Sequence, residues 1–312
     1  MSECITTHFP SHTGEGSIAV HTWLPDCPRE AIKGVIQFVH GMSEYVKRFE
    51  RMAEFFTERD YVFSGEDHAG HGESLIDGEH TGYFAAEDGW NKIVLDTYEL
   101  HLMLKTQYPD KKHILYGHSM GSFIARACAS RYPGEYDAFI FSATAGHNPG
   151  LWLGKLVADR EIKRRGGMAH SKLLNIMVMG PYVKSVKGRR TNFDWLSRDA
   201  EQVDKYRADP LCGFSFRCAG YRDLFDGLAE VSRRDWAKRV PNVPIYIVSG
   251  DNDPVGGMGR GVREVCDRLL RSGKTHVVLQ LYKGGRHEMH NEINSDEVLR
   301  GIAAFLRGVQ LV

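Results

Sequence analysis

The sequence has no excess of charge of either sign, because 40 lysines and arginines are balanced by 40 aspartates and glutamates among 312 residues. Domains that bind nucleic acid usually carry a basic surface, so this balance argues against a nucleic-acid partner. No apolar run reaches the roughly 18 residues that a membrane-spanning helix needs. Internal repeats and low-complexity tracts are also absent. What remains is the composition of an ordinary globular protein, with 42% hydrophobic and 26% charged residues.

Cysteine is present, but no C-x-x-C pair occurs that would indicate a redox or zinc motif. Residues 1–8 have neither the basic start nor the apolar stretch of a secretory signal peptide. We therefore expect reduced thiols and a cytoplasmic protein. The six cysteines are Cys4, Cys27, Cys128, Cys212, Cys218 and Cys266.

A serine between two glycines lies in the sequence Gly-His-Ser-Met-Gly at residues 117–121. The apolar residues 114–116 before it are typical of a short buried strand, and residues 122–131 after it are typical of a helix that ends before Pro133. Such a strand–turn–helix unit is a nucleophile elbow, in which small neighbours permit a tight turn that exposes the hydroxyl of Ser119. The motif can arise by chance, so a base, an acid and an oxyanion hole must be found elsewhere in the chain.

Strands and helices alternate along most of the chain. This alternation predicts an α/β protein with a mostly parallel central sheet of about eight strands and helices on both faces. The expected strands cover residues 3–9, 17–24, 32–39, 61–63, 114–116, 138–142, 244–249 and 276–282. The expected helices cover residues 45–59, 87–108, 122–131, 261–270 and 297–306.

The alternation stops after the sixth expected strand and resumes about 90 residues later. The interval is basic, helical and irregular, and it contains no strand–helix pairs. We therefore predict a core formed by residues 1–146 and 239–312, with residues 147–238 inserted as a helical cap.

Candidate acids and bases follow the last two expected strands. Residues 250–256 contain Asp251 and Asp253, and residues 284–290 contain His287 and His290. In α/β sheets ligands bind at the carboxyl ends of the strands, so we expect both loops to lie near Ser119. The order Ser, Asp, His along the chain is that of the α/β-hydrolases.

Five motifs together resemble one branch of the α/β-hydrolases, the monoacylglycerol lipases and lysophospholipases, which is often grouped with the serine aminopeptidases. The resemblance extends from about residue 15 to the end of the chain and is specific in the predicted core but loose in the predicted cap. The motifs are Gly-His-Ser-Met-Gly at 117–121, His-Gly-Met-Ser-Glu at 40–44, Asp-His-Ala-Gly-His-Gly-Glu-Ser at 67–74, Gly-x-x-Asp-Pro-Val at 250–255 and Gly-x-x-His at 284–287.

The resemblance implies a role for each matching residue. Ser119 would be the nucleophile, Asp253 the acid and His287 the base. The backbone N–H groups of Met42 and Met120 would form the oxyanion hole. Many relatives have a small residue at position 42, so a methionine there raises the question of how wide the pocket is.

Two neighbours compete for the roles of acid and base. The family spacing favours Asp253 over Asp251 and His287 over His290. We expect Asp251 to cap a helix or a turn, and we expect His290 to lie on the surface.

Histidine recurs in these motifs, which raises the question of a metal site. The run at 287–290 approaches the zinc motif H-E-x-x-H, but that motif requires a histidine where Asn291 stands. We therefore expect no metal and no cofactor. We expect Asp67, His68 and His71 to hydrogen-bond the backbone that shapes the oxyanion turn.

These features predict a cofactor-free carboxylic-ester hydrolase that acts on a monoacylglycerol, a lysophospholipid or a similar monoacyl ester. Two alternatives stay open, namely an aminopeptidase or amidase with the same triad and a non-catalytic binding protein with a hydrolase fold. A peptidase of that type needs carboxylates to hold a free α-amine. Residues 151–190 carry ten lysines and arginines and only two acidic residues, Asp159 and Glu161, so the peptidase is disfavoured.

Residues 173–179 in the predicted cap are too apolar to be left in water without reason. Either they pack on the core, or they line an acyl tunnel that is exposed when a lid opens. Methionine suits a tunnel because a flexible thioether adapts to varied chains. In that interpretation Ile176 and Met179 contact the substrate. The basic residues nearby would favour peripheral contact with an anionic lipid surface.

Overall fold

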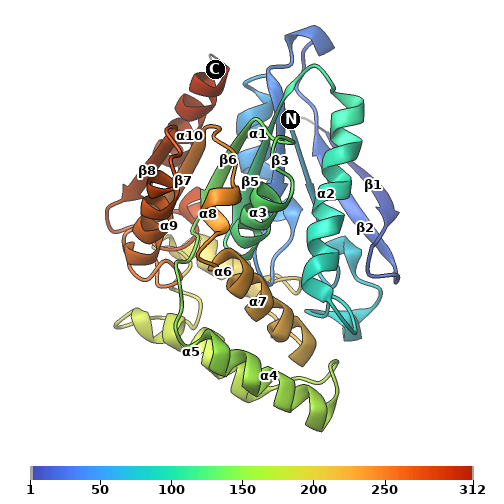
Figure 1. The fold of residues 1–312 in the computed structure, drawn as a ribbon, viewed down its shortest axis with the longest axis vertical. Helices are drawn as coiled ribbons and strands as arrows, with labels where there is room; N and C mark the ends of the chain where they lie inside the picture. Colours follow the sequence, from blue (N-terminus) through green and yellow to red (C-terminus); the bar gives the residue numbers. More distant parts are fainter. Residues whose placement is uncertain (1–2, 311–312) are drawn as a thin grey trace.

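Eight strands form one sheet in the order β1-β2-β4-β3-β5-β6-β7-β8 in the computed structural model, which describes residues 3–310 (Figure 1). Strand β2 is antiparallel to both of its neighbours, and the other adjacent pairs, from β4 to β8, are parallel. The predicted α/β fold with a mostly parallel sheet of eight strands is confirmed. The strands are β1 (Cys4–Pro10), β2 (Ser17–Trp23), β3 (Gly34–Val39), β4 (Tyr61–Glu66), β5 (Lys112–His118), β6 (Ala138–Ser142), β7 (Ile245–Gly250) and β8 (Val277–Tyr282).

The middle of the sheet is buried on both faces. Every residue of β3, β4, β6 and β7 is buried, which explains why their sequences are nearly continuous apolar runs. Strand β5 lies between β3 and β6, with Ile114 opposite Ile36 and Gly117 opposite Phe141. The residues that follow β5 therefore emerge at the centre of the edge formed by the carboxyl ends of the strands.

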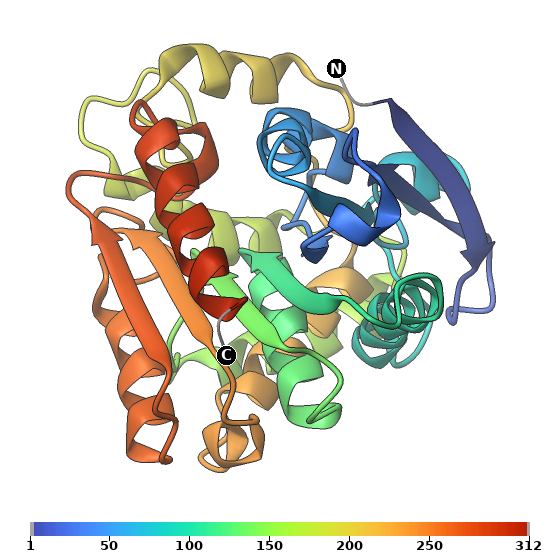
Figure 2. The ribbon, with the colours of Figure 1, turned by 90° about the horizontal axis from the view of Figure 1, so that it is seen from above.

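Two helical layers cover the sheet (Figure 2). Helices α1 (Glu50–Thr57) and α10 (Ser295–Val309) pack on one face, where Phe38, Phe63 and Val248 meet Phe56 and Ile302. Helices α2 (Gly89–Gln107), α3 (Met120–Arg131) and α9 (Arg260–Arg271) pack on the other face. These five helices lie within three residues of their expected bounds, except that α1 is preceded by a 3-10 turn, η2 (Val46–Phe49). No helix between residues 3 and 310 is both long and apolar enough to cross a membrane.

Five helices lie between β6 and β7. They are α4 (Leu151–Arg165), α5 (Lys172–Ser185), α6 (Ala200–Ala208), α7 (Cys218–Val231) and the short α8 (Trp236–Arg239). Helix α7 packs on α2 and α3, and α4 packs on α7. The two helices approach closely because Gly154 of α4 faces the ring of Phe225, where an added Cβ would lie 3.1 Å from the ring. Figure 1 shows α4 and α5 at one end of the molecule, beyond α7.

Candidate active site

The turn between β5 and α3 holds Ser119 in a backbone conformation that side chains rarely adopt. Its φ is 53° and its ψ is −120°. The flanking residues must be glycine, because a Cβ on Gly117 would lie 2.2 Å from the carbonyl oxygen of Gly121. A Cβ on Gly121 would lie 2.0 Å from the carbonyl oxygen of Val39. The expected nucleophile elbow is present, with the strain that such turns carry.

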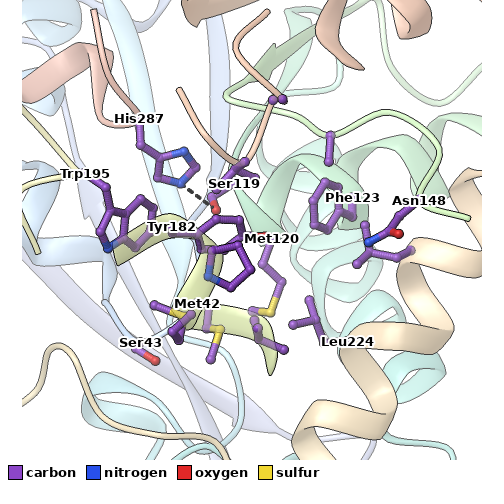
Figure 3. Close-up of a pocket in the computed structure, with 18 of the residues that line it drawn as sticks. Met42, Ser43, Ser119, Met120, Phe123, Asn148, Tyr182, Trp195, Leu224 and His287 are labelled. Carbon is purple, nitrogen blue, oxygen red and sulfur yellow. Dashed lines mark hydrogen bonds between the residues drawn. The ribbon is translucent and has the colours of Figure 1, made fainter. Parts of the chain in front are cut away.

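Three side chains from the ends of different strands form a hydrogen-bonded row. His287 Nε2 lies 2.9 Å from Ser119 Oγ, as the dashed line in Figure 3 marks. His287 Nδ1 lies 3.0 Å from Asp253 Oδ1. Asp253 is fully buried and also accepts hydrogen bonds from Ser249 Oγ and from the backbone N–H of Val255. The structure therefore brings together the three side chains that the sequence singled out.

The charge of Asp253 controls the basicity of His287. Burial alone would lower the pKa of His287, but attraction to the Asp253 carboxylate and their hydrogen bond raise it above its ordinary value. A histidine in this setting is a stronger base than a free imidazole, and its protonated form is stabilised beside the serine.

Asp251 plays a different part from Asp253. Its Oδ1 accepts a hydrogen bond of 2.7 Å from the backbone N–H of Gly284. Asp251 therefore ties the loop after β7 to the loop after β8 and does not contact His287. The prediction that Asp251 caps the next helix or turn along the chain is wrong, because its side chain binds the turn after β8 instead.

The prediction that His290 lies on the surface is wrong, because only 4% of it is exposed. Its ring packs between Phe49, at 4.5 Å between centroids, and His118, at 4.8 Å. The reason is that the chain turns inward after His287 into the 3-10 turn η5 (Met289–Asn291), which the sequence pattern does not reveal. Burial lowers the pKa of His290 to about 3, so the ring is neutral at neutral pH.

Met42 and Met120, whose backbone N–H groups are the expected oxyanion hole, both line the cavity that contains Ser119. Within residues 3–310 neither N–H group has an acceptor, so both remain able to bind an oxyanion. Ser43, the residue after Met42, has a φ of 59°, which bends the chain at this point.

Buried polar side chains hold this bend in place. The backbone N–H of Ser43 donates to His71 Nε2 at 3.3 Å, and that of Val46 donates to Asp67 Oδ1 at 2.7 Å. His68 Nε2 lies 3.1 Å from the carbonyl oxygen of His40. Burial lowers the pKa values of His68 and His71 to about 4 and about 3, so both act as neutral hydrogen-bonding groups. The expected backbone role of Asp67, His68 and His71 is confirmed.

A buried arginine clamp, which the sequence analysis missed, joins the oxyanion turn to the loop that carries His287. Arg48 donates to Glu44 at 2.8 Å and to both carboxylate oxygens of Glu288 at 2.9 and 2.6 Å. Glu44 in turn accepts the backbone N–H of Gly41 at 2.6 Å. Burial would raise the pKa of Glu288, but Arg48 holds it below its ordinary value, whereas burial raises the pKa of Glu44. The available signals were the i, i+4 spacing of Glu44 and Arg48 and the position of Glu288 next to His287.

A cavity of about 770 Å³ opens beside Ser119 and His287 (Figure 3). Most of its wall near the serine is apolar, and it extends from Trp195 to Asn148. The apolar side chains that line it include Met42, Met120, Phe123, Leu151, Met177, Val178, Met179, Leu224, Phe225 and Leu228. Its size and lining suit a ligand with a long apolar part.

The two residues of α5 that we expect to contact substrate lie in different environments. Met179 lines the cavity, but Ile176 is 65% exposed and faces solvent, so its predicted contact with the cavity is wrong. Asn175, Val178, Met179 and Tyr182 follow helical spacing along the cavity, and Ile176 lies outside that stripe. Leu174 is buried in the core cluster. Residues 173–179 therefore supply side chains both to the core and to the cavity wall, and their contact with an acyl chain stays a prediction.

Comparison with known proteins agrees with this geometry. A family described as "Serine aminopeptidase, S33" matches residues 30–294. The monoacylglycerol lipase of Mycolicibacterium smegmatis is 28% identical over 310 residues, covering 98% of each chain. The monoglyceride lipase of Homo sapiens is 26% identical over 271 residues, covering 85% of this chain and 79% of the human one. A thermostable carboxyl esterase from Bacillus coagulans, solved with glycerol, is 29% identical with a TM-score of 0.92, covering 99% of this chain and all of the esterase.

Proposed function

The chain belongs to the serine aminopeptidase S33 family of α/β-hydrolases and is a serine hydrolase of the lipase and esterase type, and we propose that it cleaves monoacylglycerols, lysophospholipids or similar monoacyl esters. The observation that carries the proposal is the row of hydrogen bonds from Asp253 through His287 to Ser119, placed at the wall of a long apolar cavity. The names of the relatives, monoacylglycerol lipase and carboxyl esterase, support the same substrate class.

In the proposed reaction Ser119 Oγ attacks the ester carbonyl while His287 Nε2 takes its proton. The N–H groups of Met42 and Met120 donate to the oxygen that becomes negative, and Asp253 stabilises the imidazolium. His287 then gives the proton to the leaving alcohol, which departs and leaves an acyl-enzyme. Water, deprotonated by His287, attacks this ester, and the fatty acid leaves as the serine regains its proton.

We also propose that residues 147–238 act as a cap on a catalytic core of residues 1–146 and 239–312. Support comes from the cavity, because Met179, Tyr182 and Trp195 of this segment line it together with Met42 and Met120. A cap of this kind would hold the acyl chain and exclude water from the acyl-enzyme.

The carboxylates that line the cavity favour an ester over a peptide with a free α-amine, because each of them already has a partner. Glu44 and Glu288 are both hydrogen-bonded to Arg48, and Glu264 accepts the backbone N–H of His147 at 3.0 Å. Among the described residues no other carboxylate lines the cavity, so an ammonium group would have no unengaged partner there.

A lipid surface is the proposed peripheral partner of α4 and α5. Large apolar side chains on these helices are between 45% and 67% exposed, which is unusual for a surface with nothing to cover it. Basic residues of the same helices, such as Arg160, Lys163 and Lys172, would add attraction to anionic lipid. The exposed apolar residues are Trp152, Leu153, Leu156, Leu173 and Ile176.

The proposal is tested by hydrolysis of a panel of monoacylglycerols, lysophospholipids, short aryl esters and aminoacyl amides. We expect turnover of the monoacyl esters, weaker turnover of short esters and none of the amides. Ser119→Ala is the matched control and should lose both hydrolysis and labelling by a fluorophosphonate. A folded wild-type protein that neither labels nor hydrolyses any ester would identify a non-catalytic binding protein, and preferred turnover of aminoacyl amides would identify a peptidase.

A further inference from the structure

The indole of Trp195 packs against the imidazole of His287. The ring centroids are 5.0 Å apart, with an interplanar angle of 45°. Trp195 belongs to the segment between β6 and β7, whereas His287 follows β8, and only 6% of Trp195 is exposed. A second ring, that of Tyr182, packs on Trp195 at 5.2 Å. Figure 3 shows Trp195 and Tyr182 beside His287, at the end of the cavity that contains Ser119.

We propose that Trp195 is a positioning residue for His287, which keeps the imidazole facing Ser119 and stabilises its protonated form during catalysis. This inference rests on the proposed function, in which His287 is the base. It extends the catalytic machinery beyond the three side chains of the row to a residue of the inserted segment.

The backbone that carries Trp195 is anchored on both sides, because residues 194–198, here named the base strap, are hydrogen-bonded along the loop that carries His287. The backbone N–H of Glu288 donates to the carbonyl oxygen of Leu196 at 2.7 Å. Arg286 donates to the carbonyl oxygens of Asp194 and Ser197. The residues immediately before and after His287 are therefore both bonded to the base strap.

The bonds continue beyond the histidine. Ser197 Oγ donates to the carbonyl oxygen of Asn291 at 2.8 Å. Arg198 Nε donates to Glu292 Oε2 at 2.9 Å, and Glu292 is buried. A backbone segment fixed by so many bonds holds the side chain that it carries against His287 more precisely than a mobile lid could.

The chemistry of the indole suggests more than the filling of space. Its Nε1–H is buried and has no acceptor among residues 3–310, so its burial is unfavourable. A phenylalanine or leucine would fill the same wall without burying a donor. A tryptophan offers instead the ring face that attracts a cation most strongly. The ring of Trp195 packs at 5.0 Å, centroid to centroid, from the side chain that becomes cationic in the proposed reaction.

The effect of Trp195 on the pKa of His287 must be separated from the effects of the charged groups around His287. Attraction to Asp253 is the main influence that raises the pKa of His287, and Glu288 and Glu44 add to it. Trp195 contributes no charge, so its removal leaves all of these groups in place. The titratable and charged groups that face His287 are Asp253 after β7, His118 on β5, Glu44 and Arg48 after β3, and Glu288 and His290 on its own loop.

The test compares Trp195→Leu, Trp195→Met and Trp195→Phe, using a short soluble aryl ester. For Trp195→Leu and Trp195→Met we expect kcat to fall by about 3- to 30-fold, the range for a desolvated cation over an aromatic ring. KM should change less than about twofold, because a short ester does not reach the rest of the cavity. The acid limb of kcat/KM against pH should move to lower pH by about half a pH unit, and Trp195→Phe should recover most of both effects.

Trp23→Leu is the matched control, because Trp23 is also buried with an indole N–H that has no partner among the described residues. It lies on β2, away from His287, and should cost stability while leaving the pH profile unchanged. Nuclear magnetic resonance titration of His287, assigned with His287→Gln, measures the same shift without turnover. An unchanged pH profile and titration in Trp195→Leu and Trp195→Met would overturn the inference. A wild-type protein without esterase activity would overturn the proposed function instead, and the titration would still decide the role of Trp195.

Discussion

The carboxyl edge of the sheet and the outer helices α4 and α5 are built on opposite principles. At the sheet edge polar side chains are buried and bonded, so that Ser119, His287, Asp253 and Arg48 each have defined partners. On α4 and α5 large apolar side chains such as Trp152 and Ile176 are exposed. The first arrangement fixes the positions of atoms, and the second leaves apolar side chains in contact with solvent. The contrast predicts that substitutions in the two regions will have effects of different kinds.

The largest effect is expected for the aspartate of the row. Asp253→Asn should lower kcat by about 10³- to 10⁴-fold, because an amide neither stabilises the imidazolium nor holds the required tautomer of His287. Asp251→Asn is the matched control, since Asp251 binds only the backbone of Gly284 in the neighbouring loop. Its kcat should stay within about threefold of wild type. Steady-state kinetics of both variants on one ester measures the two values of kcat. Similar losses of kcat in both variants would contradict the assignment of Asp253 as the acid.

The arginine clamp should give the next largest effect. Arg48→Met leaves Glu44 and Glu288 buried without their cation, which typically costs about 3 to 5 kcal/mol of stability. It should also lower kcat by about 10- to 100-fold, because the oxyanion turn and the loop that carries His287 lose their common partner. Chemical denaturation and kinetics measure the two effects.

Arg51→Met is the control for the clamp. Arg51 pairs with Asp296 at the surface, where ion pairs contribute little. It should change stability by less than about 1 kcal/mol. A clamp variant as stable and as active as Arg51→Met would show that Arg48 serves neither loop.

A smaller effect should distinguish the two faces of α5. Met179→Asp places a charge in the cavity and should reduce hydrolysis of long-chain esters about tenfold more than that of acetyl esters. Ile176→Asp should leave hydrolysis of soluble esters unchanged and weaken co-sedimentation with vesicles that contain anionic lipid. Reversed results for the two variants would place Ile176, rather than Met179, against the acyl chain.

The last effect concerns Glu66, a buried acid that does not line the cavity, and it is an effect on stability and not on substrate preference. Burial raises the pKa of Glu66 from 4.5 to about 8, although Thr97 Oγ1 donates to it. Between these values the folded state keeps a proton that the unfolded state has lost, so the free energy of unfolding falls as pH rises through this window. Relative to Glu66→Gln, the wild type should lose roughly 2 to 4 kcal/mol between pH 5 and pH 8.5. Chemical denaturation of both proteins at pH 5 and at pH 8.5 measures this loss. An equal change in the free energy of unfolding in the wild type and in Glu66→Gln would contradict the raised pKa of Glu66.

The difference between local patterns and long-range contacts explains which features could be predicted from the sequence. The strands, the elbow at Ser119 and the loops with Asp253 and His287 depend on local patterns, because burial on both faces and a tight turn restrict the residues that fit. The inward turn at His290 and the clamp at Arg48 depend on contacts between residues far apart in the chain, such as the pair Arg48 and Glu288. The i, i+4 spacing of Glu44 and Arg48 is a local signal for half of the clamp, but no local pattern encodes the pairing of Arg48 with Glu288.

Helix orientation explains the error at Ile176. The apolar residues 173–179 predicted a buried face, but the composition of a helix does not say which side turns inward when both sides are apolar. Packing of α5 over the cavity turns Met179 inward and leaves Ile176 outside. The long-range contacts of Trp195 were missed for a related reason, since its partner His287 lies 92 residues further along the chain.

The hydrogen bond between Ser119 and His287 joins residues that are 168 positions apart. A ribosome adds about 5 to 20 residues each second, so the base is synthesised roughly 10 to 30 seconds after the nucleophile. During that interval the elbow can form while its serine has no partner to take its proton. A growing chain therefore carries an inert nucleophile, and hydrolytic activity becomes possible only after His287 has been synthesised.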